Sequence, residues 1–121
     1  TELTNNQIGN LVIIDSDLSN ENDNLILNTN IVFNVQNSNN LFSFLQTPKN
    51  IRKPIKDIII NLDFNLLNSQ IYINKIRLDG NESNNEVMNL IKEFNDSNNI
   101  NDMNFNKSKN ILNEFISAYE G

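Results

Sequence analysis

The stretch KDIIINLDFNLL, from Lys56 to Leu67, decides how this chain folds. Apolar side chains occupy every second position within it, at Ile58, Ile60, Leu62, Phe64 and Leu66. Successive side chains of a β-strand point to opposite faces of its sheet, so this period of two predicts a strand with one buried face. Most of the intervening residues are Asn or Asp, so the other face of the strand should be polar.

The segments on either side of this strand repeat the alternation. From Asn24 to Gln36 the odd positions are mainly apolar and the even positions mainly polar, which predicts a second strand with one buried face. Asn68 and Ser69 predict a turn, after which Gln70 to Leu78 forms an antiparallel partner. The apolar parity shifts within that partner, which predicts a β-bulge near Asn74.

Two further strands are expected upstream. The polar residues from Asn37 to Asn40 predict a turn, and the apolar residues of Leu41 to Leu45 predict a short strand that returns antiparallel. Leu11 to Ile14 form an uninterrupted apolar run, which predicts a strand that is buried on both faces or lies at the centre of the sheet. We therefore expect the strands to lie between Leu11 and Leu78.

After Gly80 the period changes to that of amphipathic helices. Ser83 and Glu86 have the spacing of a capping box, which marks a helix N-terminus. The apolar stripes are Val87, Leu90, Ile91 and Phe94 in the first segment and Ile111, Leu112, Phe115, Ile116 and Tyr119 in the second. They predict one helix from Ser83 to Asn95 and another from Lys107 to Glu120.

A sheet with one apolar face, followed by two helices with one apolar stripe each, buries its apolar residues when the helices cover that face. We therefore predict an α+β fold: a two-layer domain in which an antiparallel sheet of roughly four to five strands is followed by two C-terminal helices packed on one face. The residues expected to be mostly buried are Phe33, Ile58, Ile60, Leu62, Phe64, Leu90, Ile91, Phe94, Phe115 and Ile116.

The length of 121 residues fits one domain, so we interpret residues 1–121 as a single α+β domain. The first residue is Thr1, which leaves open that the domain is excised from a longer chain. No apolar run reaches the roughly 18 residues of a membrane span, and no signal peptide opens the chain, so we expect a soluble protein. The lack of Cys fits a reducing compartment and slightly favours an intracellular location, although the compartment stays open.

The sequence lacks the residues of most catalytic centres. His and Cys are both absent, which removes the usual general base, the thiolate nucleophile and the soft metal ligands. No glycine-rich phosphate-binding motif occurs. Asp57, Asp63 and Asp79 leave catalysis by carboxylates alone open, but carboxylates on alternate strand positions more often form a solvated face. We therefore expect no enzymatic activity and no cofactor.

Two acidic segments were considered as calcium loops. From Asp15 to Asp23 oxygen-bearing side chains recur at alternate positions, as Ca²⁺ requires. The pattern fails because Asn20 stands in the place of the obligatory glycine and Ile26 in the place of the closing Glu. In Asp79–Ser83 the glycine comes too early. We expect no metal site.

One segment differs in charge from the rest of this acidic chain, whose formal net charge is −6. Lys49, Arg52, Lys53 and Lys56 lie within eight positions and are the candidate partner-binding residues. Such a positive patch could contact a phosphate, an anionic lipid head group or an acidic protein segment. The alternative is a solvated loop in which Pro54 separates two elements. The net charge argues against nucleic-acid binding.

Three functional hypotheses follow. The first is a non-catalytic protein–protein interaction module, an assembly or scaffold domain of a larger complex that binds a protein partner or a second copy through a sheet edge or a helix face. The alternative is an extracellular or toxin-associated accessory domain that binds lipid or glycan, with the basic segment on the anionic ligand. The third, a carboxylate enzyme, requires a cleft that concentrates Asp and Glu.

Overall fold

A computed structural model describes residues 2–5, 8–97 and 104–119 of the chain. Five strands form one antiparallel sheet in the order β1-β2-β3-β4-β5, so each strand pairs with the next one along the sequence. The strands are β1 (Glu2–Asn5), β2 (Gly9–Glu21), β3 (Asn24–Val35), β4 (Asp57–Asn65) and β5 (Gln70–Leu78). The predicted antiparallel sheet is confirmed.

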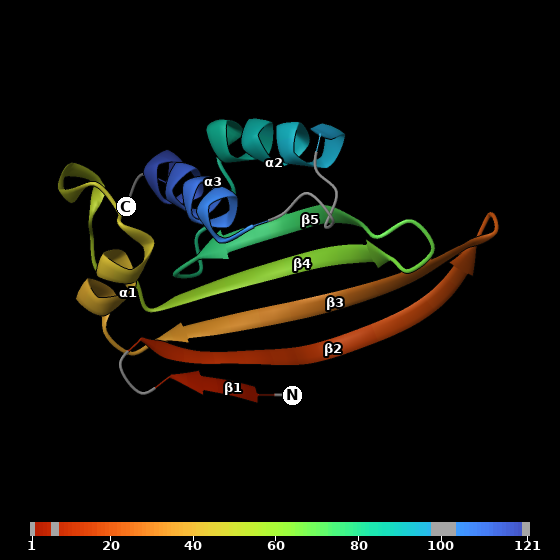
Figure 1. Cartoon of the computed structure of the whole chain (residues 1–121), viewed down its shortest axis with the longest axis horizontal. Helices are drawn as coiled ribbons and strands as arrows, with labels where there is room; N and C mark the ends of the chain where they lie inside the picture. Colours follow the sequence, from red (N-terminus) through yellow and green to blue (C-terminus); the bar gives the residue numbers. More distant parts are fainter. Residues whose placement is uncertain (1, 6–7, 98–103, 120–121) are drawn as a thin grey trace.

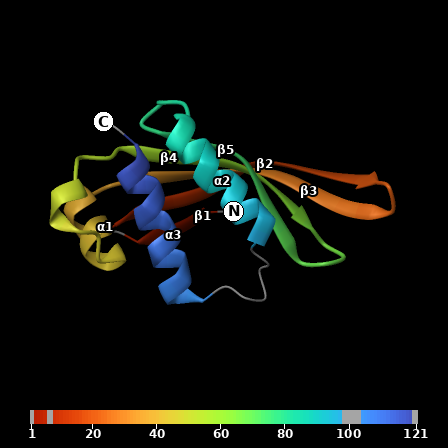
Figure 2. The same cartoon turned by 90° about the horizontal axis from the view of Figure 1, so that it is seen from above.

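The helices fall into two groups. Helix α1 (Ser38–Leu45) and the short 3₁₀ turn η1 (Lys49–Ile51) connect β3 to β4, and helices α2 (Asn85–Ser97) and α3 (Phe105–Ala118) follow the sheet. Figure 1 shows α2 and α3 above the sheet, with α1 beside α3 at one end. Seen from above in Figure 2, α2 runs along β5. The predicted α+β architecture, a sheet followed by C-terminal helices, is confirmed.

No helix in residues 2–5, 8–97 and 104–119 is long and apolar enough to cross a membrane.

The register of the strands sorts their side chains onto two faces. Cross-strand rows on the first face, here called the apolar face, are Leu11, Phe33, Ile58 and Leu78, then Ile13, Ile31, Ile60 and Ile76. Asn74 is an extra residue opposite the Asn61–Leu62 step, so the predicted bulge is confirmed. The bulge restores the apolar parity of β5.

The opposite face carries a network of amides, and we call it the asparagine face. At its centre, Asn61 Nδ2 donates to Asn30 Oδ1 (2.8 Å), and Asn61 Oδ1 accepts from Asn74 Nδ2 (2.9 Å). Asn28 Nδ2 donates to Asp63 Oδ1 (2.8 Å) and to Asn61 Oδ1 (3.2 Å). Cross-strand hydrogen bonds of this kind stabilise a sheet, which explains how Asn occupies strand positions despite its low β-propensity.

The core lies mainly between β5 and the three helices. Of the residues predicted to be mostly buried, Ile91, Phe94, Phe115 and Ile116 are buried. The other six, Phe33, Ile58, Ile60, Leu62, Phe64 and Leu90, are only half-buried. The helices therefore cover the sheet less completely than the apolar pattern predicted.

The predicted strand at Leu41 to Leu45 is wrong, because this segment is helix α1. Its buried residues Leu41, Phe42 and Leu45 lie at the three- and four-residue spacing of a helical face. The Asn37 side chain caps the helix by accepting a hydrogen bond from the Asn40 amide (3.1 Å). The polar run that suggested a turn therefore starts a helix.

The capping box at Ser83 and Glu86 is also wrong. Helix α2 begins two residues later, and Asn84 Oδ1 accepts from the Val87 amide (2.9 Å), so Asn84 is the N-cap. Ser83 Oγ instead donates to the Ile76 carbonyl of β5 (2.8 Å).

Leu11 to Ile14 form part of a strand, as predicted, but the prediction that this strand is buried on both faces or lies at the centre of the sheet is wrong. These residues belong to β2, which continues to Glu21, and Ile14 is 58% exposed. Strand β1, which the sequence did not predict, pairs only with Gly9 to Val12. The remainder of β2 therefore forms the edge of the sheet.

Candidate functional site: an apolar cavity between sheet and helices

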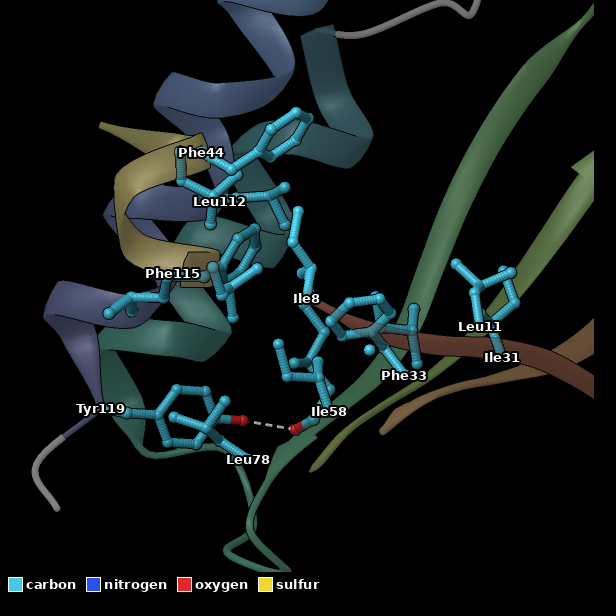
Figure 3. Close-up of a pocket in the computed structure, with 16 residues that line it drawn as sticks. Ile8, Leu11, Ile31, Phe33, Phe44, Ile58, Leu78, Leu112, Phe115 and Tyr119 are labelled. Atoms are coloured by element: carbon cyan, nitrogen blue, oxygen red, sulfur yellow. Dashed lines mark hydrogen bonds between the residues drawn. The ribbon is translucent and has the colours of Figure 1, made fainter. Parts of the chain in front are cut away.

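An apolar cavity of about 480 Å³ lies between the apolar face and helices α1 and α3. Figure 3 shows its wall of sheet residues, among them Phe33 and Ile58, facing Leu112 and Phe115 of α3. Phe33, Ile58 and Ile60 line the cavity, which accounts for their half-burial at the border of the core.

The cavity opens at a rim of exposed apolar side chains. Phe44 of α1 and Leu112 of α3 line the cavity and are 51% and 37% exposed. The ring of Phe44 also contacts that of Phe105, with centroids 5.3 Å apart, and Lys109 Nζ lies 4.8 Å from the Phe105 centroid. Large apolar groups kept in contact with water at the mouth of a cavity are typical of a binding site.

The wall formed by the two helices is held in place by one asparagine. Asn113 of α3 donates from Nδ2 to the Leu45 carbonyl (2.8 Å) and accepts at Oδ1 from Thr47 Oγ1 (2.6 Å). Thr47 is 2% exposed. This part-buried pair of hydrogen bonds joins α3 to the end of α1 and to the loop that follows it.

Among the described residues that line the cavity, Tyr119 alone carries a side-chain hydroxyl. The hydroxyl donates to the Ile76 carbonyl at 2.5 Å, as Figure 3 shows, and burial raises the pKa of Tyr119 above its usual value of 10.0. The phenol therefore stays protonated and hydrogen-bonded at neutral pH. The remaining surface of the cavity offers apolar contacts.

The predicted basic residues lie away from this cavity and divide into two pairs. Lys49 and Lys56 are exposed, whereas Arg52 and Lys53 are half-buried and hydrogen-bonded. Arg52 Nε donates to the Thr47 carbonyl (2.8 Å), just after α1, and Lys53 Nζ donates to the Tyr119 carbonyl at the end of α3. Cations at helix C-termini stabilise the unpaired carbonyls there.

Arg52 and Lys53 also line a small polar pocket of about 210 Å³ beside the start of α1. Asn37, Ser38 and Asn39 form its opposite side. The structure thus brings together two of the four predicted basic residues and leaves Lys49 and Lys56 outside the pocket lining.

Two of the three candidate catalytic carboxylates, Asp63 and Asp79, have structural partners. Asp79 Oδ1 accepts from the amides of Lys56 (2.6 Å) and Asp57 (2.9 Å), and Asp63 is bonded to Asn28 on the asparagine face. Within residues 2–5, 8–97 and 104–119, no group of three or more His, Cys, Asp or Glu side chains is placed to hold a metal ion.

Sequence reasoning missed the cavity and its rim. The sequence pattern places Leu112 on the apolar stripe of a helix and predicts a strand at Phe44. A useful signal was the position of Phe44 beside Leu45 in a segment that has a helical cap at Asn37, because a helix there turns Phe44 away from the buried face.

Comparison of the chain with protein-family models, with curated proteins and with solved structures finds no match.

Proposed function

We propose that this chain is a non-catalytic binding domain that holds the apolar chain of a lipid or a similar amphiphile between its sheet and its helices. The observation that carries the proposal is the open, apolar cavity of about 480 Å³. Sites for small ligands typically measure roughly 300–1,000 Å³ and have mostly apolar linings. Of the sequence-based hypotheses, the lipid-binding one fits this cavity best.

Burial of apolar surface would drive this binding. Each ligand CH₂ group that leaves water contributes about 0.8 kcal/mol, and the lining residues lose contact with water at the same time. The polar head of the ligand would stay at the rim near Phe44 and Leu112, where water is accessible. The Tyr119 hydroxyl is protonated at neutral pH and already donates to Ile76, so we propose no role for it as a general acid or base. The cavity would bind its ligand through apolar contacts.

A fluorescent fatty acid, parinaric acid, tests the proposal by direct titration. The variant Ile60→Phe enlarges a side chain that lines the cavity, and we expect it to weaken binding by roughly tenfold or more while the protein remains folded. Its matched control is Ile59→Phe, the neighbouring residue on the asparagine face, which should leave binding unchanged.

The ligand should also raise the melting temperature of the wild-type protein, since it binds only the folded state. Equal affinities for the two phenylalanine variants, or failure of the wild type to bind parinaric acid, would contradict the proposed site.

A second proposal is the non-catalytic protein–protein interaction module, an assembly or scaffold domain, because no strand of the described part of the chain lies beside β2 beyond its pairing with β1 on that edge. The basic segment would contribute through Lys49 and Lys56, which are exposed. Replacement of both by Glu should slow association with an acidic partner and reduce its salt dependence without loss of stability. Replacement of Arg52 and Lys53 by Glu should lower stability, because both residues bond to carbonyls at helix ends. If the double variant Lys49→Glu, Lys56→Glu associates with the partner at an unchanged rate, the basic segment is not part of the interface.

A further inference from the structure

Within the part of the chain that the structure describes, the outer edge of β2 is unpaired over most of its length. Strand β1 pairs with β2 only from Gly9 to Val12, while β3 pairs with β2 from Gly9 to Glu21. From Ile13 to Glu21, called here the free edge, no strand of the described residues lies on the outer side of β2. A strand edge of this length presents a row of backbone donors and acceptors to any extended chain.

The opposite edge of the sheet is already occupied by side chains. On β5, Asn95 Oδ1 accepts from the Ile73 amide (2.7 Å) and Asn95 Nδ2 donates to the Ile73 carbonyl (2.9 Å). The Ile76 carbonyl accepts from the hydroxyls of Tyr119 and Ser83. Because side chains already bond to these backbone groups of β5, an additional strand would pair with the edge at β2.

The two faces of the free edge have different chemistry. On the apolar face, Ile13 and Leu18 are 37% and 59% exposed. On the asparagine face lie Asp15, Asp17 and Glu21, all exposed. A bulge at Ile14 separates Ile13 from Asp15, and Ser16 and Asn20 share the apolar face with Ile13 and Leu18. From Asp15 onward, an added strand would therefore meet Leu18 between small polar groups on one face and carboxylates on the other.

The negative charge of this region disfavours a second copy of the chain as the partner of the free edge. The first 48 residues contain five acidic residues and no Lys or Arg. Antiparallel pairing of two copies along their free edges would bring carboxylates of both chains together on one face, which is unfavourable. Carboxylates on an edge strand also deter aggregation, but that role does not require exposed apolar groups such as Leu18 on the other face.

We propose that the free edge of β2 accepts an extended segment of a partner protein as an added strand, in which apolar residues alternate with Lys or Arg. This inference rests on the interaction-module proposal and specifies its surface and its partner. The apolar residues of the segment pack beside Ile13 and Leu18, and its cations pair with Asp15, Asp17 and Glu21 on the other face.

The test uses a synthetic peptide as long as the free edge, in which valine alternates with lysine. Binding is followed by amide chemical shifts of the isotope-labelled protein, which should change along β2 and not at the basic segment. A valine–glutamate peptide should bind roughly tenfold more weakly. Two N-methylated forms of the first peptide, one modified at every valine and one at every lysine, separate strand addition from simple charge attraction.

All lysine amides of an extended peptide point to one edge and all valine amides to the other, so an added strand loses binding in only one N-methylated form. The variant Asp17→Lys should weaken binding of the valine–lysine peptide about fivefold. Asp96→Lys makes the same change of charge on α2 and should have no effect. Leu18→Asn, at an exposed position, removes one apolar contact with the added strand and should also weaken binding of the valine–lysine peptide.

Equal loss in both N-methylated forms, or an equal effect of Asp17→Lys and Asp96→Lys, would overturn strand addition. So would the absence of shift changes along β2, or a dimer formed through this edge by the protein alone. These results leave the parinaric acid titration and the charge reversal at Lys49 and Lys56 unaffected, so failure of the free edge is distinguishable from failure of either proposed function.

Discussion

Asn95 of α2 acts as a substitute for a neighbouring strand, and its removal should be costly. Its amide forms two hydrogen bonds with the backbone of Ile73, at 2.7 and 2.9 Å, and Ile73 is buried. In Asn95→Ala the Ile73 amide and carbonyl both lose their partner. Leaving such groups unsatisfied costs about 1–3 kcal/mol each, and partial access of water to the half-buried Asn95 position favours the low end. We expect a loss of about 2–3 kcal/mol in the free energy of unfolding.

The assay is urea denaturation at neutral pH, supported by thermal melting, where the same loss corresponds to a fall of roughly 10 °C for a domain of this size. The m-value should not change, since the same surface is exposed on unfolding. Asn89→Ala, at an exposed position of α2, is the control and should alter stability by less than about 0.5 kcal/mol. If Asn95→Ala is equally silent, the substitute-strand role is refuted.

Asn95→Asp adds a pH dependence whose sign follows from the same geometry. An ionised carboxylate still accepts from the Ile73 amide but repels the Ile73 carbonyl, so the folded state raises the pKa of the new carboxyl above its unfolded value of about 3.9. A raised folded pKa means that the stabilising protonated form is fully present below the unfolded pKa and is lost as the pH rises through the folded pKa. The stability of the Asp variant relative to Asn95→Ala should therefore be highest in acid and should fall as the pH rises toward neutrality.

Three further substitutions test other features. Gly9→Ala should lower stability by about 1–3 kcal/mol or more, because a Cβ there would lie 2.0 Å from the Asn34 carbonyl oxygen; circular dichroism melts measure this. Tyr119→Phe should cost about 1–2 kcal/mol through the lost bond to Ile76, and should reduce the fall in stability above pH 10.0, which follows from the raised folded pKa. Glu82→Gln should lower stability slightly at neutral pH, because hydrogen bonds from its two cationic neighbours lower the pKa of this carboxyl, and the difference from wild type should vanish as the pH falls through that pKa; denaturation at several pH values checks it.

The strands in which apolar and polar residues alternate strictly were predictable, because this period of two fits a β-strand with one buried face and does not fit a helix. The segment from Lys56 to Leu67 corresponds to β4 and its following turn, and the shift of parity near Asn74 located the bulge. The segment from Leu41 to Leu45 failed because a short apolar run fits a strand and a helix equally well. Only the cap at Asn37 separated the two, and in a chain with 29 Asn a single Asn carries little information.

The candidate site was not predictable from the sequence, for a physical reason. An apolar face produces the same alternation whether helices pack directly on it or stand away from it, so Phe33 and Ile58 look like core residues in either case. The distance between the layers depends on contacts between remote elements, such as the bonds from Asn113 to Leu45 and Thr47. The use of Arg52 and Lys53 at helix ends is equally a property of the tertiary structure.

The order of the strands in the sheet has a consequence for folding kinetics. The β2–β3 and β4–β5 pairs are joined by short turns and can form as hairpins, each within roughly 1–10 μs, whereas pairing of β3 with β4 must close the longer connection that contains α1 and η1. The contacts that close the cavity are of another kind, since Thr47 to Asn113 and Lys53 to Tyr119 each join residues 66 positions apart. Closing such long loops costs chain entropy before any contact is gained, so docking of α3 should follow formation of the sheet. The cavity would then acquire its second wall only when α3 docks, late in folding.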